Sequence, residues 1–144
     1  MIKAVRHTGI VVQDLNGALD FWINVMGFRL EKQQDENTAF IDTVLGIEGS
    51  KLTTAKLAAP DGNLIELLCF SSHPDKPRWK GRPTTTGLTH IAFTVANLDS
   101  LCERLRENGC ILLSQPQISA DGHVKIVFVG AQESLLLELV EVIS

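Results

Sequence analysis

Two histidines and two glutamates occupy matching places in the two halves of this 144-residue chain. His7 and His90 each lead an apolar run, and Glu66 and Glu138 each lie in the middle of another strongly apolar run. Burying an ionised carboxylate among apolar side chains is costly unless a cation or good hydrogen bonds compensate it. Two imidazoles and two carboxylates suit a divalent first-row metal ion and leave coordination positions for water or substrate. The sequence therefore predicts one metal site made by His7, Glu66, His90 and Glu138.

Each of these residues alone has a plainer interpretation. A single histidine in an apolar run is more often a satisfied core residue, and a single glutamate on a strand often faces solvent. The metal site is favoured because all four positions recur together, with one histidine and one glutamate in each half.

An internal repeat supports this placement. The same offset, 83 residues, separates His7 from His90 and Asp14 from Asn97, and 82 residues separate Gly27 from Gly109. Asp and Asn accept hydrogen bonds at helix N-termini, and glycine is typical just after a helix ends. Apolar residues at helical spacing fill the stretch between cap and glycine in both copies.

The segments after each helix alternate as strands do. In the first half we expect strands at 28–33, 51–59 and 63–70, and in the second half at 110–118, 123–129 and 135–142. Segment 35–50 is either a long loop or a broken strand with a short helical turn. The fold class is thus α+β, with two βαβββ modules forming a half-open mixed β-barrel with its helices outside. We expect one domain over 1–144, with module 1 at 1–70, a linker at 71–86 and module 2 at 87–144.

The composition limits the kinds of molecule that the protein is expected to bind. The net charge of −4 argues against nucleic acid, and no apolar run is long enough to span a membrane. Three cysteines without a C-x-x-C pair indicate reduced thiols that pack as apolar side chains in a cytoplasmic protein. The basic residues Lys76, Arg78, Lys80 and Arg82 surround Trp79 in the linker, where a solvated segment is favoured over an anion site. We expect a small-molecule substrate and a homodimer.

Several motifs resemble the vicinal oxygen chelate superfamily, which includes glyoxalase I, methylmalonyl-CoA epimerase, extradiol dioxygenases and antibiotic-binding resistance proteins. They are the two His-led openings, the Phe-Trp-x-x-x-Met-Gly-Phe run at 21–28, and the closing Ile65-Glu66-Leu67 and Leu137-Glu138-Leu139. In that family the positions matched by His7, Glu66, His90 and Glu138 hold a metal, here expected to be Ni, Zn, Co, Mn or Fe. Fosfomycin-resistance relatives usually carry His at the position of Glu66.

The resemblance implies an isomerase or lyase of the glyoxalase type that abstracts a proton next to a metal-bound carbonyl. Glu138 is the expected base, and Glu66 or Glu48 returns the proton. Glu48 resembles the second acid/base carboxylate of the epimerases, although a solvated loop residue is the favoured interpretation. Three alternatives stay open: an epimerase acting on an acyl-CoA, a non-catalytic antibiotic-binding protein, and an Fe(II) extradiol dioxygenase.

Overall fold

The computed structural model describes residues 1–75, 77–80 and 82–144, and the chain forms two compact units, Met1–Pro77 and Arg78–Ser144. The boundary between them falls inside the segment predicted as a linker. Among the described residues of that segment there is no helix or strand. None of the described helices is long and apolar enough to cross a membrane.

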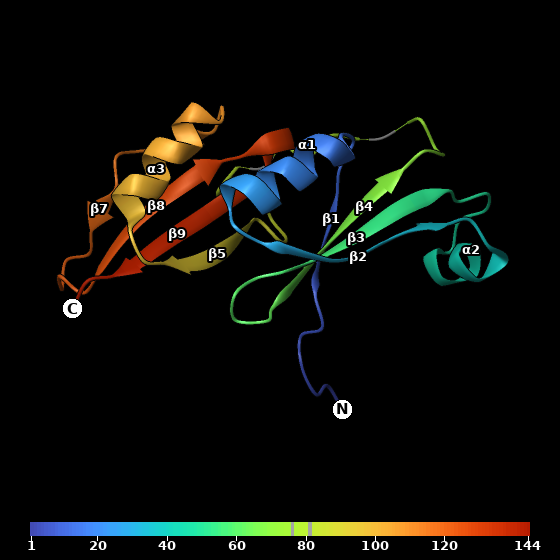
Figure 1. Ribbon diagram of the computed structural model, residues 1–144, viewed down its shortest axis with the longest axis horizontal. Coiled ribbons are helices and arrows are strands. Elements are labelled where there is room, and N and C mark those ends of the chain that lie inside the picture. The colour runs from blue at the N-terminus through green and yellow to red at the C-terminus, as the bar shows by residue number, and fades with distance from the viewer. Residues whose placement is uncertain (76, 81) are drawn as a thin grey trace. The chain divides into compact units, whose positions relative to one another are not determined.

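The first unit is a four-stranded sheet with one helix against it (Figure 1). The strands lie in the order β1-β4-β3-β2, with β1 parallel to β4 and the other pairs antiparallel. Its elements are β1 (Thr8–Val11), α1 (Leu15–Asp20) with the π-helical turn η1 (Phe21–Val25), β2 (Arg29–Glu36), α2 (Ala39–Leu45), β3 (Leu52–Ala58) and β4 (Leu64–Phe70).

The second unit repeats this plan. Its main strand order is β5-β9-β8-β6, with β5 parallel to β9, and β7 also pairs with β8. Its elements are β5 (His90–Val95), α3 (Leu98–Glu107), β6 (Ile111–Leu112), β7 (Gln117–Ile118), β8 (Val124–Gly130), the 3-10 turn η2 (Gln132–Ser134) and β9 (Leu136–Val142). The predicted fold class, α+β with two βαβββ modules, is confirmed. The half-open barrel that would join the modules stays a prediction.

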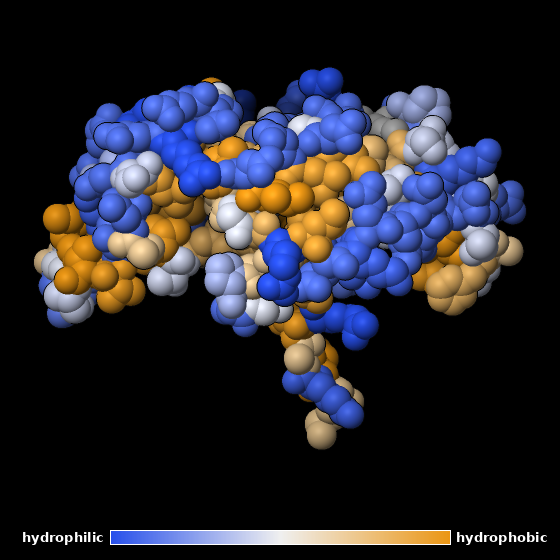
Figure 2. Space-filling model, viewed as in Figure 1, coloured by the Kyte–Doolittle hydropathy of each residue, from blue (hydrophilic) through white to orange (hydrophobic). Residues whose placement is uncertain are grey.

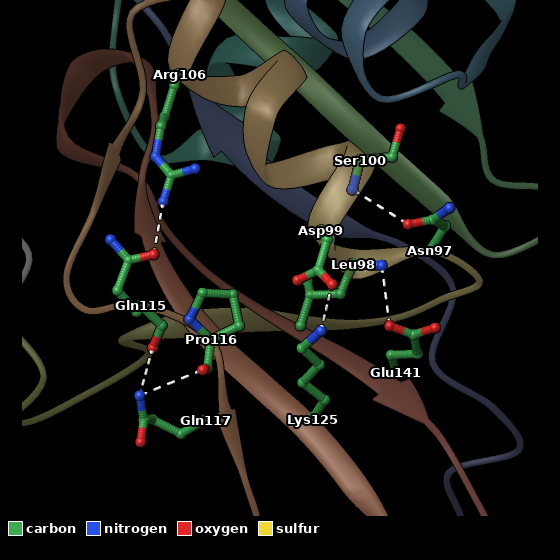
Figure 3. A network of polar contacts seen from close by, with 10 residues as sticks. All are labelled: Asn97, Leu98, Asp99, Ser100, Arg106, Gln115, Pro116, Gln117, Lys125 and Glu141. Carbon is green, nitrogen blue, oxygen red and sulfur yellow. Dashed lines mark hydrogen bonds and ion pairs between the residues drawn. The ribbon is translucent and has the colours of Figure 1, made fainter.

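The predicted helix starts are confirmed in both units. The Asp14 carboxylate accepts a hydrogen bond from the Gly17 N–H at 3.0 Å, and the Asn97 side chain accepts one from the Ser100 N–H at 3.1 Å. A polar network fastens the start of α3 to the sheet (Figure 3): Glu141 of β9 accepts from the Leu98 N–H at 3.0 Å, and Lys125 of β8 donates to Asp99. The Asp99 carboxylate raises the pKa of Lys125.

In β4 and β9, the strands that carry the glutamates, each glutamate is less buried than the residues on either side of it. In β4 and β3 the buried side chains include Ile65, Leu67 and Leu57, on the side of the sheet that α1 contacts. In β9, Leu137 and Leu139 are fully buried on the corresponding side, where α3 contacts the strand. Since neighbouring residues of a strand point to opposite faces, Glu66 and Glu138 lie on the faces away from the helices.

Two segments differ from the expected elements. The strand predicted over 110–118 is split into β6 and β7. The ladder with β8 stops at Leu112 and resumes at Gln117, and the break between them includes Pro116, which has no N–H to give to a ladder. In segment 35–50 the helical-turn alternative is correct: β2 runs on to Glu36, and the helix α2 follows.

Helix α2 is held by hydrogen bonds to the Asp42 side chain rather than by burial of apolar side chains. It buries no residue, and Phe40 and Val44 are 73% and 62% exposed. Figure 2 shows the resulting hydrophobic surface over α2, at the right of the view. The Asp42 carboxylate accepts hydrogen bonds from the backbone N–H groups of Gly49 and Ser50 at 2.9 and 2.8 Å. These bonds tie the helix to the loop that leads into β3, and they lower the pKa of Asp42.

Candidate metal centre

His7 and Glu66 form the first pair of predicted ligands. Gly9 of β1 lies opposite Glu66 of β4, and His7 precedes Gly9 by two residues, so the two side chains share the open face of the sheet. The Nε2 atom of His7 is 3.8 Å from Oε1 of Glu66. Both side chains are shielded, with Glu66 only 15% exposed.

His90 and Glu138 form the second pair with the same register. Ala92 of β5 lies opposite Glu138 of β9, and His90 again precedes that residue by two positions. The Nε2 atom of His90 is 3.1 Å from Oε2 of Glu138, and the Glu138 side chain is 22% exposed. Each unit thus brings its predicted histidine and glutamate together on the face away from its helix. The two halves of the sequence repeat therefore form the same local His–Glu arrangement, one in each unit.

Three neighbours of these pairs were missed by the sequence analysis. Lys56 of β3 lies opposite Glu66, with Nζ 3.8 Å from Oε2. Thr89 places Oγ1 2.8 Å from Nδ1 of His90, and the ring of Phe128 meets the His90 ring edge-on with centroids 5.0 Å apart. Lys56 stands out in the sequence as a charge inside an apolar strand, which was the one available signal. The place of Phe128 depends on the cross-strand register, and the contact of Thr89 with His90 depends on the rotamers of two adjacent side chains.

The donor set fits a divalent ion. Each pair offers one imidazole nitrogen and one carboxylate, a mixture suited to first-row metals. Nδ1 of His7 is buried and has no hydrogen-bond partner among the described residues, so that ring nitrogen is a donor or acceptor still to be satisfied. Within the described part of the chain, no three His, Cys, Asp or Glu side chains are grouped so as to hold a metal by themselves. The four-residue site thus requires both pairs and stays a prediction.

Glu48, the other predicted acid/base residue, lies in an exposed bend between α2 and β3. It precedes Leu52, where β3 begins opposite Phe70, whereas Glu66 lies opposite Lys56 further along the strand. Four residues of strand span about 13 Å, so Glu48 stands at the other end of β3 from the pair. The structure does not bring Glu48 to Glu66.

The remaining candidates behave as surface or core residues. Trp79 of the linker is partly exposed, and the neighbouring Lys76 lies outside the described residues. Cys102 and Cys110 are buried, and desolvation raises the pKa of both thiols, which keeps them protonated at neutral pH. These two cysteines pack as apolar side chains, as predicted.

Curated relatives match almost the whole chain. A 2-epi-5-epi-valiolone epimerase of Actinomyces sp is 29% identical over 145 residues, covering 95% of this chain and 78% of its own length. A probable lactoylglutathione lyase of Vibrio cholerae is 26% identical over 140 residues, covering 95% of this chain and 89% of its own.

Solved structures share the fold. A glyoxalase family protein from Bacillus cereus superposes with a TM-score of 0.92 at 23% identity, over 100% of this chain and 97% of that one. The fosfomycin resistance protein FosX from Listeria monocytogenes, solved with Mn(II), has a TM-score of 0.67 at 17% identity, over 96% of this chain and 90% of FosX.

A family model matches residues 4–133, which is most of the chain. The match ends before β9, the strand that carries Glu138. The match covers the His-led openings of both modules and the closing Ile65-Glu66-Leu67 of the first. The chain belongs to the glyoxalase/bleomycin resistance protein/dioxygenase superfamily.

Proposed function

We propose that the protein is a divalent-metal-dependent enzyme of the glyoxalase type, an isomerase or lyase that removes a proton from a carbon next to a carbonyl group. The observation that carries the proposal is the pair of His–Glu contacts at equivalent register positions in the two units. His7, Glu66, His90 and Glu138 would together hold one ion, with Ni, Zn, Co, Mn and Fe as the candidates.

The residues divide the work as follows. A divalent ion held by these residues would supply a Lewis acid for the negative charge that develops on the carbonyl oxygen. Glu138 takes the proton from carbon, the role that the family resemblance implies for it, and its carboxylate adjoins the His90 ring. Glu66 returns the proton. Glu48 was the other candidate for this step, but its place at the far end of β3 makes Glu66 the better choice.

The curated relatives support proton transfer as the reaction class. One relative is named as an epimerase and another as a probable lactoylglutathione lyase. Both epimerisation next to a carbonyl and glyoxalase chemistry begin with loss of a proton from carbon. An epimerase acting on an acyl-CoA is therefore the second candidate. We also propose that the protein works on a small molecule and as a homodimer.

The first experiment is a measurement of metal content. Wild type, Glu138→Gln and His90→Ala are purified and loaded with each candidate ion, and bound metal is counted per chain. We expect about one ion per chain in wild type and little in either variant. Glu141→Gln is the matched control, because Glu141 lies on the same strand but bonds to the start of α3. Absence of bound metal in wild type after loading would contradict the proposal and would favour the antibiotic-binding alternative.

The second experiment tests the reaction. Metal-loaded protein is offered hemithioacetals and chiral acyl-CoA thioesters, and proton exchange at the carbon is followed in deuterated water. Under saturating metal, Glu138→Gln should abolish exchange. A variant that binds metal more weakly but exchanges at the wild-type rate would mean that Glu138 is only a ligand. Oxygen consumption with a catechol and Fe(II), without proton exchange, would instead identify a dioxygenase.

A further inference from the structure

The two His–Glu pairs are equivalent in register but have different neighbours. At the position opposite the glutamate, the first unit has Lys56 and the second has Phe128. The Lys56 ammonium lies 3.8 Å from the Glu66 carboxylate. The Phe128 ring packs against His90 and brings no charge. Among the described residues, a permanent positive charge therefore lies beside the carboxylate of the first pair and not beside that of the second.

The two imidazoles are also held differently. Nδ1 of His90 pairs with the Thr89 hydroxyl, and Nε2 faces Glu138 at 3.1 Å. A histidine that binds a metal is typically held in this way, through its other ring nitrogen. Nδ1 of His7 has no such partner among the described residues, and its Nε2 is 3.8 Å from Glu66. The second pair is the better prepared of the two to bind an ion.

We propose that the two halves of the site bind the ion unequally: His90 and Glu138 form the tight half, and Lys56 weakens the half formed by His7 and Glu66. The inference rests on the proposed function, because it takes the ion to be shared by both pairs. An ion bound to Glu66 faces the Lys56 ammonium across a single carboxylate, and the two positive charges repel. Lys56 also supplies the counter-charge that Glu66 needs when the ion is absent.

The size of the effect follows from charge and screening. At about 4 Å, two unit charges interact strongly enough to change an equilibrium several-fold even in water, and a divalent ion doubles the interaction at a given distance. The Lys56 side chain is 34% exposed, so solvent screens part of the repulsion. Removing the Lys56 charge should therefore tighten metal binding about fivefold to tenfold.

The test is the dissociation constant of Mn(II) and of Zn(II), measured by competition with a metal-binding dye. Lys56→Met and Lys56→Gln should both bind the ions about fivefold to tenfold more tightly than wild type. Lys56→Arg keeps the charge and should stay within about twofold of wild type. Lys32→Met is the matched control, because Lys32 lies opposite Lys56 on β2 and is exposed. It should also stay within about twofold.

A second comparison tests the inequality directly. Glu138→Gln should weaken binding more than Glu66→Gln does, because the Glu66 carboxylate already shares its charge with Lys56. Equal losses, or wild-type affinity in both neutral Lys56 variants, would overturn the inference while wild-type metal binding kept the proposed function in place. Absence of bound metal in wild type and in the Lys56 variants alike would overturn both.

Discussion

Gly17 lies in the first turn of α1 and donates its N–H to the capping Asp14 carboxylate. Replacing Gly17 with alanine should set two stabilising effects against each other. An alanine Cβ built at Gly17 would lie 2.3 Å from Oδ2 of Asp14 and 2.9 Å from Cγ of the same side chain. Oδ1 of that carboxylate accepts the hydrogen bond from the Gly17 N–H that caps α1. Gly17→Ala therefore has to displace the capping carboxylate in order to fit.

The two effects are of similar size. Alanine in place of glycine inside a helix stabilises by roughly 0.5 to 1 kcal/mol. Loss of an Asp N-cap costs about 1 kcal/mol. Gly17→Ala alone should thus leave the free energy of unfolding within about 0.5 kcal/mol of wild type. Asp14→Ala should lower it by about 1 kcal/mol, and adding Gly17→Ala to that variant should recover roughly 0.5 to 1 kcal/mol.

Urea unfolding of wild type, the two single variants and the double variant forms a complete cycle. The reasoning is refuted if Gly17→Ala stabilises wild type as much as it stabilises the Asp14→Ala variant. That result would mean that Asp14 adopts another capping geometry without loss. The second unit shows that such a geometry exists: Ser100, the counterpart of Gly17, carries a Cβ under a working Asn97 cap.

Three further perturbations test the fold and its titrating groups. Leu139→Ala, at a fully buried position of β9, should lower the free energy of unfolding by about 2 to 5 kcal/mol, whereas the exposed Val142→Ala on the same strand should change it by less than about 0.5 kcal/mol in urea titrations. The pKa of Asp42 is lowered in the folded state, so its contribution to stability is present above the unfolded pKa near 3.8 and is lost as pH falls through the folded value. Melting temperatures from pH 6 down to pH 2 should therefore fall more steeply for wild type than for Asp42→Asn, and parallel curves would show that the loop bonds do not matter. Because burial raises the pKa of the Cys102 and Cys110 thiols, both should react with a thiol reagent at neutral pH much more slowly than in urea-unfolded protein, and equal rates would contradict their burial.

The sequence was enough to predict the modules, because they depend on local patterns, and it singled out the four residues that the structure brings together as two pairs. A cap, a helical stripe and a glycine mark each helix, and an apolar run around a single glutamate marks each last strand. Once β1 and β5 are placed parallel to β4 and β9, the register puts each histidine on the same face as its glutamate. The repeat supplied the evidence that a single copy lacks.

What the sequence did not reveal depends on neighbours across strands. Lys56 is separated from Glu66 by a turn, and only the β3–β4 register shows that the two residues are opposite. The break between β6 and β7 contains Ser114, Gln115 and Pro116, two polar residues and a proline that the strand expected over 110–118 ran across. The role expected of Glu48 came from resemblance rather than from register, and the register places it away from the pair.

The divergence of the two units follows from the cost of a shielded carboxylate. Glu66 and Glu138 occupy the same place in equivalent sheets, so each needs compensation for its charge. Lys56 provides it permanently in the first unit. In the second unit, Glu138 lies beside His90, which carries a charge only when it is protonated. The proposed divalent ion would therefore compensate the most charge at Glu138, where the neighbouring side chains that the structure describes supply no permanent positive charge and the imidazole is held by Thr89.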